Sequence, residues 1–257
     1  MSVPSVLVHR DADVLAQAVA ARLITGLVDA QAAKGSAHVA LTGGGMGISS
    51  LAAVAATPAR DAVDWRNLDI WWGDERFLPT GDPERNETGA RRALLDQVDV
   101  DPARVHVMRG PDAGVTPEES AERYAAELRE AARPEDHGPV PSFDVLMLGM
   151  GPDGHVASLF PGMPALHEER PVVAVHGSPK PPPTRISLTF PALQAAREVW
   201  VIAAGEEKAG AVHLALQESG PLQVPAAGAR GRLRTLFLLD RAAASKIPPS
   251  LVRPASP

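Results

Sequence analysis

The residues with the clearest chemical potential lie together in residues 143–162. An apolar run ends there in two closely spaced glycines, and Asp153 and His155 follow almost at once. This pattern predicts a strand buried on both faces that turns tightly at its carboxyl end, where open α/β sheets bind ligands. We therefore interpret His155 as a functional imidazole rather than a histidine hydrogen-bonded into a core. Asp153 either orients that imidazole or caps a helix expected over the apolar residues that follow.

A second group of ionisable residues follows another predicted strand, residues 67–72. Asp74, Glu75 and Arg76 stand in a row directly after it, and a structural loop rarely requires three consecutive charges. A solvated ion-pair cluster is the alternative interpretation. The functional interpretation places Asp74 and Arg76 at the mouth of the same pocket as His155.

A glycine run forms the third candidate. Residues 37–42 predict a strand, and Gly43, Gly44 and Gly45 lead from it into a helical pattern. Exposed backbone N–H groups at the positive end of a helix dipole bind anions. The spacing matches neither the dinucleotide fingerprint nor a nucleotide P-loop. On this segment alone, a phosphate cradle and a tight structural turn remain equally consistent.

Three further cations stand at unusual positions. Lys180 lies in a stiff proline-rich segment, residues 177–183, and Arg185 begins an alternating strand. Lys208 falls in the first turn of a predicted helix, where a positive charge opposes the helix dipole. An anionic partner would explain that lysine, and a side chain pointing into solvent is the alternative.

The elements that would position these residues alternate between strand and helix. The remaining strands are predicted at residues 5–8, 105–108, 171–176, 185–190, 198–204 and 233–240, the second of them at an edge. The longest predicted helix begins after Asp11 and runs to about Lys34, and others cover residues 86–97 and 118–132. The alternation predicts a three-layer α/β/α sandwich with a mostly parallel sheet, a modified Rossmann-like arrangement.

The domain organisation follows from the same pattern. The sequence shows no internal repeat and no second domain, so we predict a single α/β domain over residues 1–246. Residues 247–257 form a Pro-rich tail that we expect to be disordered.

The bulk composition excludes several classes of protein. The chain has 257 residues, a hydrophobic content of 45%, no cysteine and a formal net charge of −6. These values indicate a sizeable core, no disulfides, and no general nucleic-acid binding. No signal peptide or membrane-spanning run is visible, so we expect a cytoplasmic protein without a membrane partner. We also expect a monomer or a weak homo-oligomer. His155 has no second histidine at ligand spacing, so neither a metal site nor a cofactor is expected.

Taken together, these motifs resemble the 6-phosphogluconolactonase family, within a larger group that includes glucosamine-6-phosphate deaminase. The resemblance spans nearly the whole chain in the family's order, through residues 41–47, 71–79, 149–162, 178–190 and 203–212. Residues 149–162 and 178–190 carry motifs that are specific to this family, whereas the glycine loop alone would not identify it. Met46 and Gly47 replace the Ser/Thr-Pro that the family's loop carries, so backbone N–H groups must suffice there. Arg85 replaces a serine, while Asn86 is kept.

The resemblance implies hydrolysis of 6-phospho-D-glucono-1,5-lactone to 6-phospho-D-gluconate, the second step of the oxidative pentose phosphate pathway. It implies that His155 is the general base, that Arg76 is a charged donor near the carbonyl or ring hydroxyls, and that Asp74 holds hydroxyls or orients the site. The groups it implies for substrate and phosphate binding are the amides of Gly43, Gly44 and Gly45, and the side chains of Lys180, Arg185, Lys208 and Asn86.

Two other functions remain open. Glucosamine-6-phosphate deaminase/isomerase uses an Asp and a His in similar positions, but its second motif resembles Asp-Glu-Tyr rather than the Asp-Glu-Arg-Phe of residues 74–77. A non-catalytic sugar-phosphate binder on the same fold would be expected to have an altered pocket. A dinucleotide-dependent dehydrogenase is disfavoured because the fingerprint is missing.

Overall fold

The computed structural model describes residues 2–136, 138–217 and 219–254. Within these residues, seven strands form one sheet in the order β10-β1-β9-β8-β5-β2-β3, and every neighbouring pair is parallel. The bounds of these strands are β1 Pro4–His9, β2 Ala37–Leu41, β3 Leu68–Trp72, β5 Val145–Gly149, β8 Glu198–Ala203, β9 Arg234–Asp240 and β10 Val252–Pro254. Because β5, β2 and β8 are central, both of their faces need cover.

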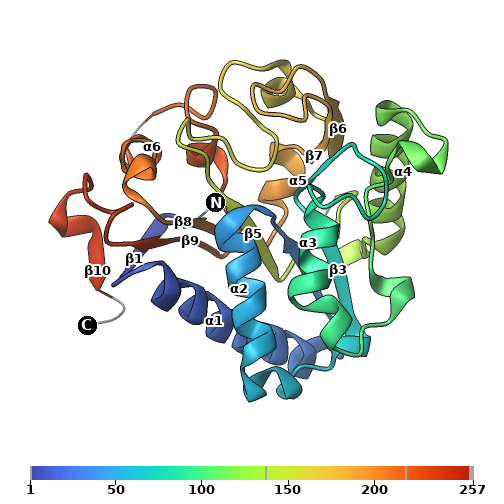
Figure 1. The fold of residues 1–257 in the computed structure, drawn as a ribbon, viewed down its shortest axis with the longest axis horizontal. Helices are drawn as coiled ribbons and strands as arrows, with labels where there is room; N and C mark the ends of the chain where they lie inside the picture. The colour runs from blue at the N-terminus through green and yellow to red at the C-terminus, as the bar shows by residue number, and fades with distance from the viewer. Residues whose placement is uncertain (1, 137, 218, 255–257) are drawn as a thin grey trace.

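Helices cover both faces of this sheet (Figure 1). Their bounds are α1 Ala12–Lys34, α2 Gly44–Ala56, α3 Asn86–Ala93, α4 Pro117–Ala131, α5 Phe190–Gln194 and α6 Ala209–Leu216. Alternate residues of β5 belong to two separate cores: Val145 and Met147 pack with α1, α2 and α3, while Leu146 and Leu148 pack with α4, α5 and α6. The predicted three-layer α/β/α sandwich with a mostly parallel sheet is therefore confirmed.

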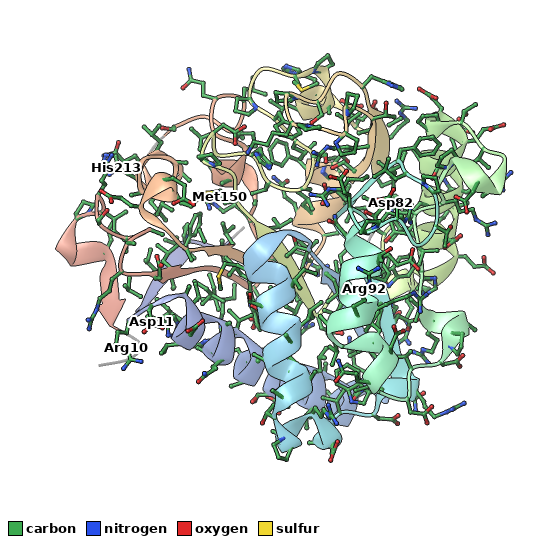
Figure 2. The ribbon with its side chains drawn as sticks, in the orientation of Figure 1. Arg10, Asp11, Asp82, Arg92, Met150 and His213 are labelled. Atoms are coloured by element: carbon green, nitrogen blue, oxygen red, sulfur yellow. The ribbon has the colours of Figure 1, made fainter. Side chains whose placement is uncertain are left out.

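The first helix begins and ends as its sequence predicts. The side chain of Asp11 accepts a hydrogen bond from the backbone N–H of Val14 at 2.8 Å, and Gly35 ends the helix in the left-handed conformation with φ 77°. Figure 2 shows Asp11 beside Arg10 where α1 starts, and these side chains form an ion pair at 2.9 Å. The capping residues thus fix the length of the long helix that packs under the sheet.

A second, smaller sheet was not predicted. Strands β4 (Asp74–Arg76), β7 (Arg185–Leu188) and β6 (Val172–Val175) pair antiparallel in the order β4-β7-β6. Residues 171–176 and 185–190 were predicted as strands, but β4 consists of three charged residues, so it has no hydrophobic periodicity from which a strand could be predicted. This sheet places Arg76 opposite Arg185.

Two predicted elements are absent from the described part of the chain. Residues 105–108 form no strand, because only one isolated bridge, between Ile70 and Val105, joins that segment to the sheet. Residues 156–160 form no helix either: Val156 bridges both Met150 and Leu159, which folds the segment back on itself. Bridges within the loop, together with burial of Val156 and Leu159 in the core, prevail over the helical spacing of this segment.

The tail is also more ordered than predicted. Val252–Pro254 form β10, which pairs with β1 at the edge of the sheet (Figure 1). The expectation of a disordered tail is therefore wrong for these residues, and residues 255–257 lie outside the described ones. Without β10, β1 would be an unpaired edge strand, and such edges readily recruit further chain.

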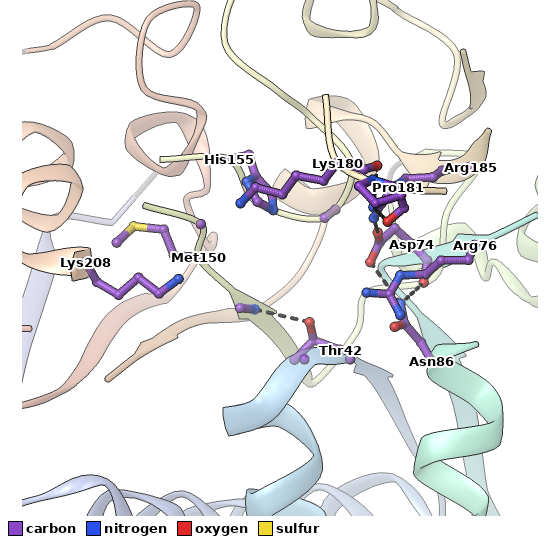
Figure 3. Close-up of a pocket in the computed structure, with 15 residues that line it drawn as sticks. Thr42, Asp74, Arg76, Asn86, Met150, His155, Lys180, Pro181, Arg185 and Lys208 are labelled. Carbon is purple, nitrogen blue, oxygen red and sulfur yellow. Dashed lines mark hydrogen bonds and ion pairs between the residues drawn. The ribbon is translucent and has the colours of Figure 1, made fainter. Parts of the chain in front are cut away.

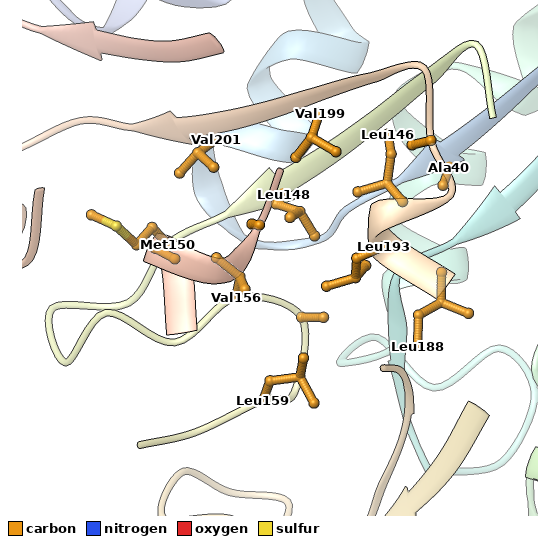
Figure 4. Packing of buried hydrophobic residues seen from close by; sticks show 14 of the residues in the cluster. Ala40, Leu146, Leu148, Met150, Val156, Leu159, Leu188, Leu193, Val199 and Val201 are labelled. Atoms are coloured by element: carbon orange, nitrogen blue, oxygen red, sulfur yellow. The ribbon is translucent and has the colours of Figure 1, made fainter. Parts of the chain in front are cut away.

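The core fixes the loop that follows β5. Leu148 and Met150 leave the strand among buried residues of β8, and Val156 and Leu159 return the chain to the same cluster (Figure 4). Both of these returning side chains are fully buried. The short segment between Met150 and Val156, which carries Asp153 and His155, is therefore held at both ends by packing. Among the described residues, no helix combines the length and the apolar character needed to cross a membrane.

Candidate active site

A cavity of about 290 Å³ lies at the carboxyl ends of the central strands. Its lining residues are Thr42, Gly43, Gly44, Asp74, Arg76, Asn86, Gly149, Met150, Gly151, His155, Ala157, Lys180, Pro181, Arg185 and Lys208. Nine of the eleven site residues expected from the sequence are among them. The other two, Asp153 and Gly45, do not line the cavity. The fold thus gathers segments that lie far apart in the sequence.

His155 and Asp153 form a hydrogen-bonded pair at the edge of this cavity. His155 Nδ1 lies 2.6 Å from Asp153 Oδ1, and the backbone N–H of His155 also donates to that oxygen. The histidine ring packs against Phe160 with 4.4 Å between ring centroids. Asp153 caps no helix, so of its two expected roles the structure supports the orientation of His155.

Burial and charge shift both pKa values of the pair. Burial lowers the pKa of His155, and the hydrogen bond and charge of Asp153 only partly oppose this. Burial would raise the pKa of Asp153, but the hydrogen bond from His155 and the positive charge of Lys180 outweigh it and leave that pKa below its usual value. A neutral imidazole beside an ionised carboxylate is the favoured state at neutral pH.

Two glycines allow the loop that carries this pair to pack closely. A Cβ atom on Gly151 would lie 2.1 Å from His155 Nδ1 and 2.3 Å from Asp153 Oδ1. Gly154 has φ +81°, and a Cβ there would lie 2.7 Å from the side chain of Val224. The glycines after β5 therefore allow close packing of the loop, as their type suggested.

Asp74 is fixed by neighbours from three separate segments of the chain. Its Oδ2 accepts a hydrogen bond from Ser158 Oγ at 2.6 Å, and the Asn86 side-chain amide donates to its backbone carbonyl at 2.8 Å. Arg185 Nη1 lies 3.9 Å from the same Oδ2. Ser158, which is fully buried, was missed because it stands within an apolar pattern that predicted a helix. A lone polar residue in that pattern is the only signal of its role.

Cations enter the cavity from opposite sides. Figure 3 shows Arg76 and Lys208 pointing toward the middle from the two sides of the cavity, with Lys180 beside His155. Burial and the nearby charge of Lys180 lower the pKa of Lys208, although Glu207 opposes them. Two positive charges facing one space favour an anionic ligand.

Arg185 has a second task that the sequence did not reveal. Its Nε donates to the carbonyl of Pro182 at 3.1 Å, and its Nη2 donates to those of Lys180 and Pro181 at 3.0 Å each. Its guanidinium carbon also lies 5.7 Å from the centre of the Phe160 ring. Arg185 thus holds the proline-rich segment that carries Lys180, and its guanidinium already donates three hydrogen bonds to backbone carbonyls of that segment.

The glycine run begins α2 at the cavity wall. Gly43 is the N-cap of α2, and a Cβ on it would lie 1.8 Å from Asn86 Oδ1. Thr42 Oγ1 accepts a hydrogen bond from the backbone N–H of Gly149 at 3.1 Å, which joins the ends of β2 and β5. Gly43 and Gly44 line the cavity, so the positive end of α2 faces it.

Six lining residues were not predicted as site residues: Thr42, Gly149, Met150, Gly151, Ala157 and Pro181. All of them adjoin a predicted residue or motif in the sequence, so their positions follow from the motifs, but their types carry no chemical signal. Ala157 adopts φ +50°, which is unusual for a residue with a side chain. In the described part of the chain, no three His, Cys, Asp or Glu side chains gather as a set of metal ligands.

The fold and cavity define an α/β protein that carries a histidine–carboxylate pair and several cations at its strand ends. The model of the family described as glucosamine-6-phosphate isomerases/6-phosphogluconolactonase matches residues 10–237. The chain therefore belongs to this family.

Individual relatives agree with this assignment. A 6-phosphogluconolactonase from Streptomyces coelicolor is 63% identical over 98% of both chains, and one from Mycobacterium tuberculosis is 47% identical over 95% of this chain and 98% of its own. The solved structure of a 6-phosphogluconolactonase from Trypanosoma brucei superimposes with a TM-score of 0.80 at 28% identity, and the match covers 95% of this chain and 99% of that one. The resemblance noted in the sequence is confirmed.

Proposed function

We propose that this chain hydrolyses 6-phospho-D-glucono-1,5-lactone to 6-phospho-D-gluconate, the second step of the oxidative pentose phosphate pathway. The observation that carries the proposal is the His155–Asp153 pair at 2.6 Å, placed at a cavity that also holds Arg76, Lys180 and Lys208. Relatives named 6-phosphogluconolactonase support the choice of substrate. The partner of the enzyme is then a small sugar phosphate.

His155 is the general base of the proposed reaction. The hydrogen bond to Asp153 favours the tautomer with the proton on Nδ1 and leaves the Nε2 lone pair to accept a proton from water. Water attacks the lactone carbonyl carbon as that proton moves to Nε2, and a tetrahedral oxyanion forms. The ring C–O bond then breaks, and the proton passes from the imidazolium to the departing ring oxygen. The lowered pKa of His155 keeps it neutral and ready at neutral pH.

The cations divide the remaining work. Arg76 lies on the β4 side of the cavity, beside Asp74, and donates to the developing oxyanion. Lys208 lies on the other side and binds the 6-phosphate with the backbone N–H groups at the start of α2, while Lys180 closes over it. Asp74, held by Ser158, accepts hydrogen bonds from ring hydroxyls.

Two assays on the purified chain test this proposal. We expect acid release from freshly prepared 6-phosphogluconolactone well above its spontaneous hydrolysis, and no ammonia release from glucosamine 6-phosphate. Ammonia release without lactone hydrolysis would favour the deaminase. The fold alone does not separate the two, because a monomeric glucosamine-6-phosphate deaminase superimposes with a TM-score of 0.76 at 20% identity. Binding of 6-phosphogluconate without any turnover would indicate a non-catalytic sugar-phosphate binder.

A further inference from the structure

Glu75 is a buried carboxylate that stands behind the cavity rather than in it. It is 2% exposed and is not among the lining residues. Its Oε1 accepts the backbone N–H of Arg76 at 2.9 Å and of Asn86 at 2.6 Å, and its Oε2 accepts the backbone N–H of Glu87 at 2.8 Å. One side chain thus satisfies the first N–H groups of α3 and one N–H group of β4.

These bonds join two elements that both supply the cavity. Strand β4 carries Asp74 and Arg76, and α3 begins with Asn86. The Asn86 side-chain amide in turn donates to the backbone carbonyl of Asp74 at 2.8 Å and lies 3.3 Å from its Oδ1. A shift of Glu75 would therefore move a cation and an amide that face the proposed substrate.

Arg85 supplies the countercharge for this carboxylate. Its side chain is 1% exposed, and its Nη2 lies 3.7 Å from Glu75 Oε2 and 3.1 Å from Glu87 Oε2. Its Nη1 and Nη2 also donate to the carbonyls of Leu78 at 2.9 Å and Met108 at 2.7 Å. The arginine at this position, where the family pattern has a serine, thereby ties Glu75 to the surrounding loops.

We infer that Glu75 is a positioning residue for the proposed hydrolysis, which acts through Arg76 and Asn86 without touching substrate. The inference rests on the proposed function. Its geometric basis is independent of the substrate, because three backbone N–H groups from two cavity elements converge on one carboxylate. Arg76 must meet an oxyanion at hydrogen-bond distance, and misplacement by about 1 Å can cost roughly 100-fold in rate.

The ionisation of Glu75 adds a pH signature. Burial raises its pKa to about 7, although Arg85 and the three backbone N–H groups oppose this. The charged and titratable groups around it are Asp74, Arg76, Arg85, Glu87, Tyr124 and Arg185. Protonation turns one acceptor oxygen into a donor that faces N–H groups. Acidification should therefore weaken the contacts by which Glu75 joins β4 to α3.

The test compares Glu75→Gln and Glu75→Asp with matched controls at an exposed glutamate of α4, Glu122→Gln and Glu122→Asp. Gln offers an amide where an acceptor is needed, and Asp is one methylene too short to reach all three N–H groups. For both Glu75 variants we expect kcat to fall roughly 10- to 100-fold, with a much smaller change in KM. As the pH falls, kcat/KM of the wild type should drop in a step near pH 7, where Glu75 becomes protonated, because kcat/KM reports the titration of groups in the free enzyme. Glu75→Gln should lack this step. The controls should match the wild type.

Hydrogen exchange measured by mass spectrometry gives a readout that does not depend on turnover. In the folded Glu75 variants, amides of residues 74–89 should exchange faster than in the wild type, while α1 and α4 should be unchanged. Should Glu75→Gln fail to fold, Glu75→Asp and the wild-type pH profile decide. Wild-type kcat and unaltered exchange in a folded Glu75 variant, or a wild-type kcat/KM that stays level from pH 8 to pH 6, would overturn the inference. A wild type that does not hydrolyse the lactone would contradict the proposed function. The exchange data would still test whether Glu75 holds β4 and α3 together.

Discussion

At the scale of single residues, the two nitrogens of the His155 ring have different surroundings. Nδ1 is hydrogen-bonded to Asp153 at 2.6 Å. Glycine is the only residue type at position 151 that leaves space for this contact, because any Cβ there would overlap the His155 ring. The sequence placed all three residues within one motif. It left open whether Asp153 capped a helix, because that choice depends on how residues 156–160 pack.

Asp153→Asn should lower the pKa of His155 further. Burial already lowers that pKa, and the aspartate is the main group that opposes the shift, so its loss removes a contribution that raises the pKa. NMR titration of the His155 ring in wild type and variant measures the change directly. A pKa that rises in the variant, or stays the same, would show that Asp153 does not tune the ring.

Separate loss of the base and of the phosphate anchor should affect different kinetic constants. We expect His155→Ala to lower kcat roughly 10²- to 10⁴-fold with little change in KM, because a general base acts in the transition state. Lys208→Ala should instead raise KM about 10- to 100-fold, the value of a lost hydrogen bond to a charged group. Steady-state kinetics on both variants, with thermal unfolding as the folding control, check this.

The reverse pattern would move these roles to other residues. Near-normal kcat in His155→Ala removes it as the base. Unchanged KM in Lys208→Ala means that the phosphate lies elsewhere, and Lys180 at the same cavity is then the first alternative.

At the scale of elements, the site depends on how closely the starts of α2 and α3 approach each other. Gly43, the N-cap of α2, leaves no space for a side chain because Asn86 at the start of α3 fills it. A further contact of this kind joins the same helices, since a Cβ on Gly89 would lie 2.7 Å from Ile48 Cδ1. Glycine at both positions lets the two helices share one wall of the cavity.

Gly43→Ala should therefore lower the free energy of unfolding by about 1–3 kcal/mol, the usual cost of overpacking. Gly45→Ala is the matched control, because nothing lies within 4 Å of a Cβ built there. That variant should be as stable as the wild type or slightly more so, as alanine favours helices over glycine by up to about 1 kcal/mol. Urea denaturation of both proteins provides the measurement. Equal stability of the two variants would contradict the close packing of Gly43 against Asn86.

At the scale of the whole molecule, β10 extends the sheet beyond the predicted domain. Residues 252–254 pair with Val6, Leu7 and Val8 of β1, although the sequence places them in a Pro-rich tail. The strand lies at the far edge of the sheet from β2 and β3, whereas the cavity lies where β2, β5 and the β4 segment end. The tail should therefore support stability rather than catalysis.

A chain that ends at residue 246 tests this separation and the proposed domain boundary. We expect it to keep wild-type kcat and KM, and to lose roughly 2–5 kcal/mol of unfolding free energy, because the buried side chain of Ile247 and a few backbone hydrogen bonds are removed. Its exposed β1 edge should also favour association. Chemical denaturation, kinetics and light scattering measure these properties. A truncated chain that folds but has lost kcat would show that the tail matters to the cavity.

The sequence by itself determined most of the strands and helices, the three-layer architecture and most residues of the cavity. These follow from periodicity, from glycines at strand ends and from polar residues that local structure does not require, and all of these are local signals. Only the tertiary structure decided that β4, β7 and β6 form a second sheet, that residues 156–160 are not helical, that Ser158 donates to Asp74, and that Glu75 pairs with Arg85 and accepts the backbone N–H of Asn86. Those features depend on contacts between residues distant in sequence, and the free energy of such contacts cannot be seen in any one segment.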